Sequence, residues 1–168
     1  LILLTQMLPG TLLVIPIYLM FKGWGLLDTH LALILAYATF SLPFCIWMLK
    51  GYFDTIPVEL EEAAVVDGCT RLQVLRLIVL PLSLPGLTVT AMFAFVLAWN
   101  DLVLAITLNT NPELRTVAVG LASFVGEYGT PWGQIMAASA VTSLPILLLF
   151  LFLQRYLLYG LTAGAVKG

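Results

Sequence analysis

Three glutamates stand close together in the stretch from Ile56 to Pro85, the longest polar interruption of a largely apolar chain. Glu59 and Glu62 are three residues apart, so a helix would place them on one face. Paired carboxylates are the acid–base groups of glycosidases, but nothing in this stretch would keep water away from the pair. The glutamates are better suited to bind basic or hydrogen-bond-donating groups of another molecule.

Asp101 is the one carboxylate within an apolar stretch, and it directly follows Trp99 and Asn100. A charge at the centre of a bilayer costs about 2.5–3.5 kcal/mol on insertion scales, so Asp101 should face protein or water. Sugars stack on aromatic rings and hydrogen-bond to amides and carboxylates. Trp99, Asn100 and Asp101 are therefore candidates for lining a sugar pathway. The alternative is that Asp101 lies near the outer interface and anchors or caps a helix.

The other reactive side chains predict no catalytic site. His30 and Asp28 lie in one short turn, where Asp28-Thr29 is expected to cap the following helix rather than to form an acid–base pair. Cys45 and Cys69 stand at neither metal-binding nor redox spacing and are expected to be reduced thiols. The sequence has no nucleophile–base pair, no His/Cys/Asp metal cluster and no glycine-rich phosphate loop. We expect no catalytic residue, no bound metal and no ATP site in this chain.

The composition is that of an integral membrane protein. Of the 168 residues, 61% are hydrophobic and 10% are charged, and the mean hydropathy is +1.07. A soluble domain carries about 25% charged residues. The net charge of −2 offers no basic patch for nucleic acid. We predict an all-α, polytopic helical membrane protein that forms a single domain over residues 1–168.

The apolar runs predict four membrane spans, since a helix needs about 20 mainly apolar residues to cross a bilayer core. The spans are expected at residues 1–21, 31–49, 84–108 and 133–154. Four spans place both chain ends and the loop over residues 51–83 on one side. The basic residues on that side are Lys50, Arg71, Arg76, Arg155 and Lys167, against Lys22 and Arg115 on the other. Because basic residues favour the cytoplasm, the loop and both chain ends are predicted to be cytoplasmic.

The loop between the second and third predicted spans carries the signals of two short helices. Gly68 supplies the left-handed residue that ends a helix, and Thr70 with Gln73 forms the capping-box pattern that begins another. Prolines mark the limits of this helix–turn–helix: Pro57 at the first turn, and Pro81 and Pro85 at the close of the second helix.

The first of these helices is suited to contact a protein. Ala63 and Ala64 would leave a shallow face, which another surface could approach closely. The alternative is an amphipathic connector that lies on the lipid headgroups. Because anionic lipid would repel the glutamates of this helix, we favour docking onto a protein partner.

Several motifs resemble those of one family. Glu62-Ala63-Ala64, followed by Gly68 and Ile78-x-Leu80-Pro81, resembles the EAA signature of permease subunits in binding-protein-dependent ABC importers. The surrounding PVELEEAAVVDG is similar to the carbohydrate branch, which includes maltose and glycerol-phosphate permeases. Trp99-Asn100-Asp101, the stretches TVAVGL and WGQIMAA, and the ending QRYLLYGLTAGAVKG resemble the same branch. The resemblance therefore covers nearly the whole chain.

The resemblance implies a transport subunit without a catalytic site of its own. In such importers two permease subunits form the pathway and an extracytoplasmic sugar-binding protein delivers the solute. Separate ATPase subunits hold ATP and Mg²⁺, so no cofactor is expected on this chain. The residues implied in coupling to the ATPase are Glu62, Ala63, Ala64 and Gly68, flanked by Glu59 and Asp67. The implied location is the cytoplasmic (inner) membrane of a bacterium or archaeon, as a multi-pass protein surrounded by lipid.

The chain departs from the family pattern in its number of spans. Such permeases usually have six, whereas this sequence predicts four. The chain begins Leu1-Ile2 without an initiator Met or a basic n-region, so we expect no signal peptide and a missing N-terminal part that holds two spans. The competing functions are an importer for a non-sugar solute such as an amino acid, a membrane-embedded enzyme or scaffold that uses Asp101 and His30, and an autonomous channel.

Overall fold

Helices make up nearly all regular structure in the part of the chain that the computed structural model describes, residues 9–126 and 129–165. The elements in chain order are α1 (Gly10–Gly23), α2 (His30–Phe53), α3 (Val58–Val66), α4 (Arg71–Val74), the π-helical η2 (Leu75–Val79), α5 (Leu80–Asn100), α6 (Val103–Leu108), the 3₁₀ turn η3 (Pro112–Leu114), α7 (Val117–Ala122) and α8 (Trp132–Ala165). An isolated bridge between Gly126 and Gly129 is the only β-type pairing among the described residues. The prediction of an all-α protein is confirmed.

Three described helices are long and apolar enough to cross a membrane: His30–Phe53, Arg71–Asn100 and Trp132–Gln154. The first and third contain the predicted spans 31–49 and 133–154. The predicted span 1–21 falls partly outside the described residues, because residues 1–8 are not among them. Its described part belongs to α1, an apolar helix of 14 residues that is too short to be counted with the three.

The predicted span 84–108 differs from the observed helix at both ends. The helix begins at Arg71 and runs through η2 into α5, which ends at Asn100. Asp101 is extended (φ −72°, ψ 128°), and the short helix α6 follows as a separate element. Hydropathy missed this break because the residues on both sides of it are apolar.

Pro81 and Pro85 do not close the second loop helix, contrary to the prediction. A proline ring clashes with the carbonyl four residues earlier in an α-helix. Here a π turn directly precedes Pro81, and the Leu80 N–H bonds to the Leu75 carbonyl five residues back. The wider turn relieves the clash, and such turns are one of the recognised ways in which helices accommodate irregularity.

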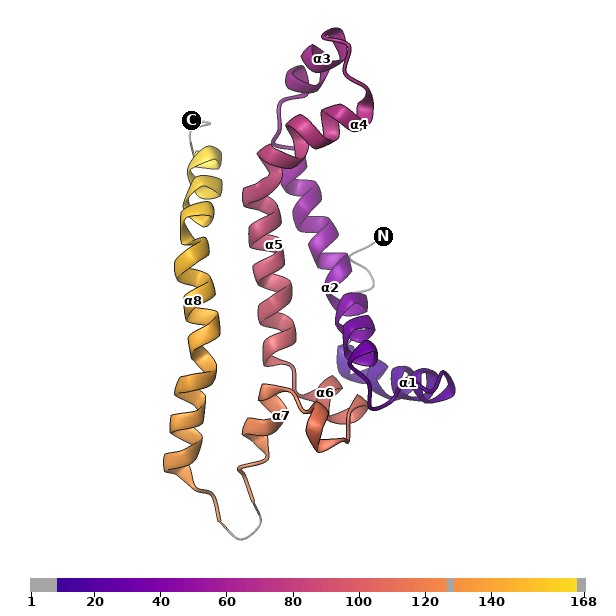
Figure 1. The fold of residues 1–168 in the computed structure, drawn as a ribbon, viewed down its shortest axis with the longest axis vertical. Coiled ribbons are helices and arrows are strands. Elements are labelled where there is room, and N and C mark those ends of the chain that lie inside the picture. The colour runs from indigo at the N-terminus through magenta and orange to yellow at the C-terminus, as the bar shows by residue number, and fades with distance from the viewer. Residues whose placement is uncertain (1–8, 127–128, 166–168) are drawn as a thin grey trace.

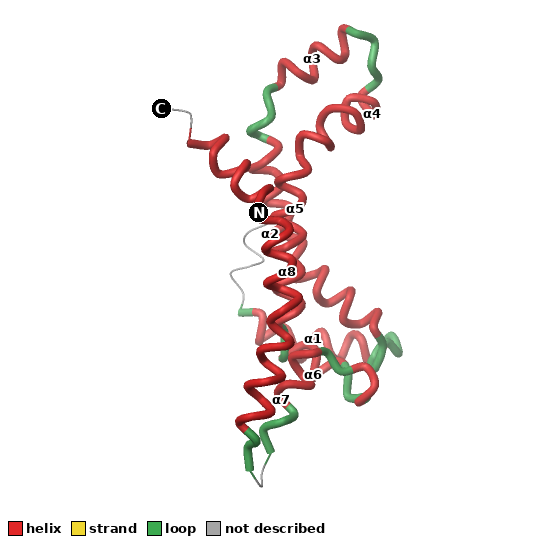
Figure 2. Tube along the Cα trace, turned by 60° about the vertical axis from the view of Figure 1, so that its left-hand side comes forward, coloured by secondary structure: helices red, strands yellow, loops and turns green. Residues whose placement is uncertain are grey.

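The long helices lie side by side, with α5 between α2 and α8 (Figure 1). The pair α3–α4 projects at one end, where α8 also has its C-terminal end, while α6 and α7 lie at the other end (Figure 1). Figure 2 shows the same division, with loops gathered at the two ends and helix between them.

The buried apolar core of the described residues is formed by α1, the start of α2, α6 and α7. Its members are Phe21, Ala32, Leu33, Ala36, Leu104, Ala105, Leu108 and Val119. Few residues of the three long helices are buried within the chain. In the most apolar 18-residue window of α8, no residue is buried. This pattern is typical of helices whose apolar surface faces lipid or other helices.

Candidate functional site

The pair α3–α4, with its connection Asp67–Thr70, forms the hairpin in which the sequence placed the coupling residues. Pro57 precedes α3 as its cap residue, so its missing N–H leaves no bond unmade. Glu59 and Glu61 lie in the first turn, where carboxylates interact favourably with the positive end of the helix dipole. The acidic start of α3 therefore stabilises the helix and also faces solvent.

The end of α3 is a Schellman motif centred on Gly68. The Gly68 N–H donates to the Val65 carbonyl and the Cys69 N–H to the Ala64 carbonyl, both at 3.0 Å. Gly68 has φ +87°, a left-handed conformation that side chains disfavour, although a Cβ there would touch nothing within 4 Å. The requirement for glycine is thus conformational rather than steric, and the predicted turn is confirmed.

The start of α4 is the predicted capping box. The Thr70 Oγ1 accepts the Gln73 N–H at 3.4 Å, and the Gln73 Oε1 accepts the Thr70 N–H at 2.8 Å. The two reciprocal bonds satisfy backbone donors that a helix start leaves free. Together with the Schellman motif they define the path of the chain from α3 into α4 by local hydrogen bonds.

The two alanines of the motif face different surroundings. Ala63 is exposed, whereas Ala64 is only 5% exposed, as is Val74 of α4. Since α3 contacts α4 and η2, Ala64 lies against the chain itself. Its small side chain allows the two helices to approach each other, and only Ala63 remains available to a partner, which corrects the prediction of a shallow two-alanine face.

A groove of about 590 Å³ runs beside the two helices of the hairpin. It is lined by Val58, Glu61, Glu62, Val65, Val66, Arg71 and Val74. Among the described side chains, none of the hairpin's carboxylates forms an ion pair. Val66 is 86% exposed, so the groove combines unpaired acidic groups with uncovered apolar surface. Glu59 and Asp67 are exposed but do not line it.

The three residues of the second candidate site, Trp99-Asn100-Asp101, point to different parts of the structure and do not form one site. The Trp99 indole N–H donates to the Thr142 carbonyl of α8 at 3.2 Å. The Asn100 amide donates to the Val96 carbonyl of its own helix at 2.8 Å. Asp101 Oδ2 accepts from the Tyr37 hydroxyl at 3.3 Å and from the Ala105 N–H at 3.1 Å. Three neighbours in the sequence thus have three different partners.

Asp101 lies at the edge of a cavity of about 310 Å³ between α1, α2, α5 and α6. Its polar lining residues are Thr11, Tyr37, Ser41 and Asp101, and the rest of the lining is apolar or glycine. Asn100 and Asp101 also line a shallower depression of about 370 Å³. Trp99 lines neither. Tyr37 could not be predicted from the sequence as a site residue, because nothing local distinguishes it from any other tyrosine in a span.

The turn between α1 and α2 differs from its prediction. Thr29 alone caps α2, accepting the Ala32 N–H at 3.2 Å. Asp28, at φ +57°, instead accepts the N–H groups of Thr110 at 2.6 Å and Asn111 at 2.9 Å. The hydrogen bonds from Asn111 and Thr110 lower the pKa of Asp28 below its ordinary value. Asp28 therefore ties this turn to the connection between α6 and η3.

The described residues contain no cluster of three or more His, Cys, Asp or Glu side chains that could hold a metal ion. The arrangement that remains suited to a function is the hairpin, which offers acidic and apolar surface at the end of two membrane-length helices.

Comparison with known proteins identifies the family. Residues 1–161 match the family of binding-protein-dependent transport system inner membrane components. The diacetylchitobiose uptake system permease protein DasC of Streptomyces coelicolor is 47% identical over 165 residues, which are 98% of this chain and 60% of that protein.

Two further relatives carry the names of sugar transport systems. The trehalose transport system permease protein SugB of Mycobacterium tuberculosis is 42% identical over 99% of this chain and 61% of its own length. The trehalose/maltose transport system permease protein MalG of Thermococcus litoralis is 40% identical over 97% of this chain and 59% of its own length. The chain thus spans about three fifths of the length of these relatives, and it belongs to the family of binding-protein-dependent transport system inner membrane components.

Proposed function

We propose that this chain forms part of the permease subunit of an ATP-driven importer, which carries a sugar or sugar derivative across the cytoplasmic membrane. The observation that carries the proposal is the hairpin, with its unpaired carboxylates and exposed valines at one end of membrane-length helices. Family membership supports a role in transport without catalysis by this chain. Relatives named for diacetylchitobiose and for trehalose and maltose support a saccharide as the solute.

The hairpin docks on an ABC ATPase subunit, which holds the ATP and Mg²⁺. Glu61 and Glu62 offer negative charge to basic or donor groups of the ATPase, and Val65 and Val66 offer apolar surface beside them. Glu59 and Asp67 flank this contact as exposed charges. The other partners are a second permease subunit, an extracytoplasmic sugar-binding protein and the surrounding lipid.

The hairpin passes its movement to the membrane helices. ATP binding draws the ATPase subunits together, and the docked hairpins follow. Because α4, η2 and α5 form one continuous helix from Arg71 to Asn100, the hairpin is joined directly to a membrane-length helix. The hairpin and both chain ends lie on the cytoplasmic side, an orientation that Lys50 and Arg71 near the hairpin support.

The solute pathway passes Asn100 and Asp101 rather than Trp99. Both polar residues line the shallower depression, and Asp101 also lines the cavity beside α1, at the end of α5 that lies away from the hairpin. Trp99 already donates its indole N–H to α8, and Phe95 packs on its ring with centroids 5.2 Å apart. A side chain held in this way is unsuited to stacking on a passing sugar.

Charge reversal on the hairpin tests the docking. The variant Glu62→Lys should weaken capture of the ATPase subunit by about tenfold or more, since a misplaced charge costs several kcal/mol at an interface. The matched control is Glu113→Lys, the same reversal on an exposed residue of η3, at the other end of the molecule. It should leave capture unchanged. Equal capture for wild type and Glu62→Lys, with both proteins inserted in the membrane, would overturn the docking role.

Uptake assays test the solute class. Proteoliposomes that hold the importer and its binding protein should accumulate labelled oligosaccharide when ATP is enclosed. Unlabelled disaccharides should compete with the label, whereas amino acids should not. ATP-dependent uptake of an amino acid in the same vesicles, without uptake of a saccharide, would replace the sugar by a different solute.

A further inference from the structure

The last turn of α2 interlocks with α5 at the base of the hairpin. Gly86 of α5 is buried, and a Cβ built on it would lie 2.7 Å from Tyr52 Cδ1 and Cδ2 and closer still to Cγ. Non-bonded carbon atoms do not approach one another so closely. The Tyr52 ring therefore sits on the bare backbone of Gly86, and a residue with a side chain would displace it.

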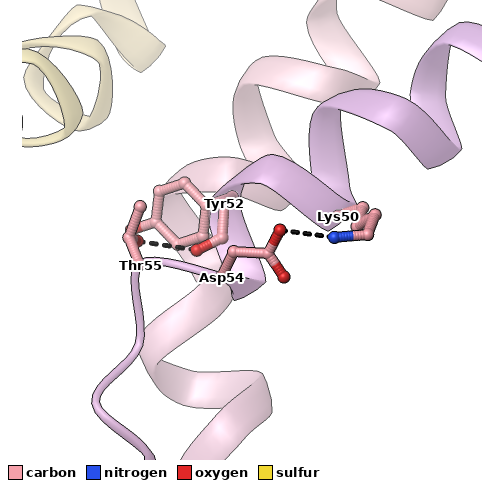
Figure 3. A network of polar contacts seen from close by, with 4 residues as sticks. All are labelled: Lys50, Tyr52, Asp54 and Thr55. Carbon is pink, nitrogen blue, oxygen red and sulfur yellow. Dashed lines mark hydrogen bonds and ion pairs between the residues drawn. The ribbon is translucent and has the colours of Figure 1, made fainter.

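Tyr52 is also tied by hydrogen bonds on both sides of this contact. Its hydroxyl donates to the Leu82 carbonyl of α5 at 3.3 Å. Its own carbonyl accepts the Thr55 hydroxyl at 2.6 Å and the Thr55 N–H at 3.0 Å, at the turn that leads to α3 (Figure 3). The Lys50–Asp54 ion pair on the same turn is largely exposed, and pairs of this kind contribute little. Tyr52 thus joins the hairpin's entry to α5 through both its ring and its hydroxyl.

The segment that leads from the hairpin into α5 is an irregular helix. It passes through η2, in which hydrogen bonds span five residues instead of four, and such turns are common at sites where helices deform. The Ser83 hydroxyl donates to the Val79 carbonyl directly after this segment, and Ser83 is fully buried. A force on the hairpin would bend η2 unless a second connection held the hairpin to α5 beyond it. Gly86 lies in α5 beyond η2, and its contact with the Tyr52 ring supplies this second connection between the hairpin and α5.

We propose that Tyr52 and Gly86 are positioning residues: their contact makes the hairpin, α2 and α5 move together, so that ATP hydrolysis is coupled to solute movement. This inference rests on the proposed function and deepens it. Without the contact, the hairpin still docks on the ATPase but flexes about η2. The importer would then hydrolyse ATP with little uptake.

The test compares Gly86→Ala and Tyr52→Ala with two controls. Gly51→Ala adds the same methyl group one residue before Tyr52, at a glycine with nothing within 4 Å of the added Cβ. Tyr52→Phe keeps the ring and removes only the 3.3 Å hydrogen bond. For each variant one measures membrane insertion, capture of the ATPase subunit, ATP hydrolysis, and sugar taken up per ATP hydrolysed.

We expect Gly86→Ala and Tyr52→Ala to capture the ATPase as wild type does and to lose about tenfold in uptake per ATP, a loss within the range of measured coupling energies. Gly51→Ala and Tyr52→Phe should stay near wild type. In the double variant the added methyl group no longer meets a ring, so Gly86→Ala should cause no further loss on top of Tyr52→Ala. If Gly86→Ala fails to insert, Tyr52→Ala carries the test, because it leaves the backbone of α5 unchanged.

The possible failures are distinguishable. Wild-type uptake per ATP in both Gly86→Ala and Tyr52→Ala, or independent losses that add up in the double variant, would overturn the positioning role and leave the proposed function standing. A wild-type protein that neither captures the ATPase nor supports uptake would overturn the proposed function, and the positioning role with it.

Discussion

The Tyr37 hydroxyl of α2 donates a hydrogen bond to Asp101 Oδ2 at 3.3 Å, and the same oxygen accepts the Ala105 N–H at 3.1 Å. One carboxylate thereby joins a membrane-length helix, the break after α5 and the first turn of α6. These are contacts of the anchoring kind that the sequence offered as an alternative to a pathway role for Asp101. Asp101 also lines the cavity between α1, α2, α5 and α6, which is the basis of its proposed role in the pathway.

Substitutions at Asp101 separate anchoring from solute contact. Asp101→Ala should lower the thermal unfolding midpoint (Tm) of the solubilised protein, because leaving a partly buried donor unpaired costs about 1–3 kcal/mol. Asp101→Asn keeps one acceptor oxygen and should lower Tm less. Tyr37→Phe removes one net hydrogen bond, worth about 0.5–1.5 kcal/mol. An unchanged Tm for Asp101→Ala, combined with lost uptake, would favour a role in the pathway instead.

The bonds to Asp28 predict a dependence on pH. Its pKa is lowered in the folded protein by hydrogen bonds from Asn111 and Thr110, so folding favours the deprotonated form. The stabilisation is complete above the unfolded-state pKa of about 3.9 and is lost as pH falls through the lower, folded-state value. Wild type should therefore exceed Asp28→Asn in Tm at pH 6, and the difference should shrink below about pH 4. A difference in Tm that is constant from pH 6 to pH 3 would contradict this assignment.

Turns and helix ends that are formed by hydrogen bonds between near neighbours could be predicted from the sequence. The turn at Gly68 and the capping box of Thr70 and Gln73 each depend on hydrogen bonds between groups no more than five residues apart. Such bonds form in the same way in almost any context, because the chain itself holds the partners together. The hairpin was therefore found, while the burial of Ala64 against the chain itself was not, since it depends on how α3 meets α4 and η2.

Contacts between distant residues could not be predicted. The partners Tyr37 and Asp101 are 64 positions apart, and Asp28 and Thr110 are 82 positions apart. Each pair exists only once the helices have packed, and no local pattern marks either member. The break after α5 was missed for a related reason: hydropathy measures transfer from water to lipid, and the apolar residues of α6 satisfy it without continuing the span.

The glycine turn of the hairpin predicts a conformational effect of substitution. Gly68→Ala should destabilise the hairpin by about 1–2 kcal/mol, because φ +87° is unfavourable for a residue with a Cβ. Gly68→Asn should cost less, since asparagine tolerates left-handed conformations better. Amide hydrogen exchange at the end of α3 measures the effect locally. Gly51→Ala, in the last turn of α2, is the control and should not speed exchange in α3. Equal exchange for Gly68→Ala and wild type would show that the left-handed conformation of Gly68 does not stabilise the hairpin.

The indole of Trp99 predicts a structural rather than a solute-binding effect. Trp99→Phe keeps an aromatic ring beside Phe95 but removes the hydrogen bond to the Thr142 carbonyl, so it should lower Tm by an amount equivalent to about 0.5–1.5 kcal/mol. The KM for sugar uptake should not change, because Trp99 lines neither depression near Asp101. Trp47→Phe, at a half-exposed position of α2, is the matched control and should change neither quantity. A raised KM with an unchanged Tm would mean that the solute contacts the indole, and Trp99 would then return to the pathway beside Asn100 and Asp101.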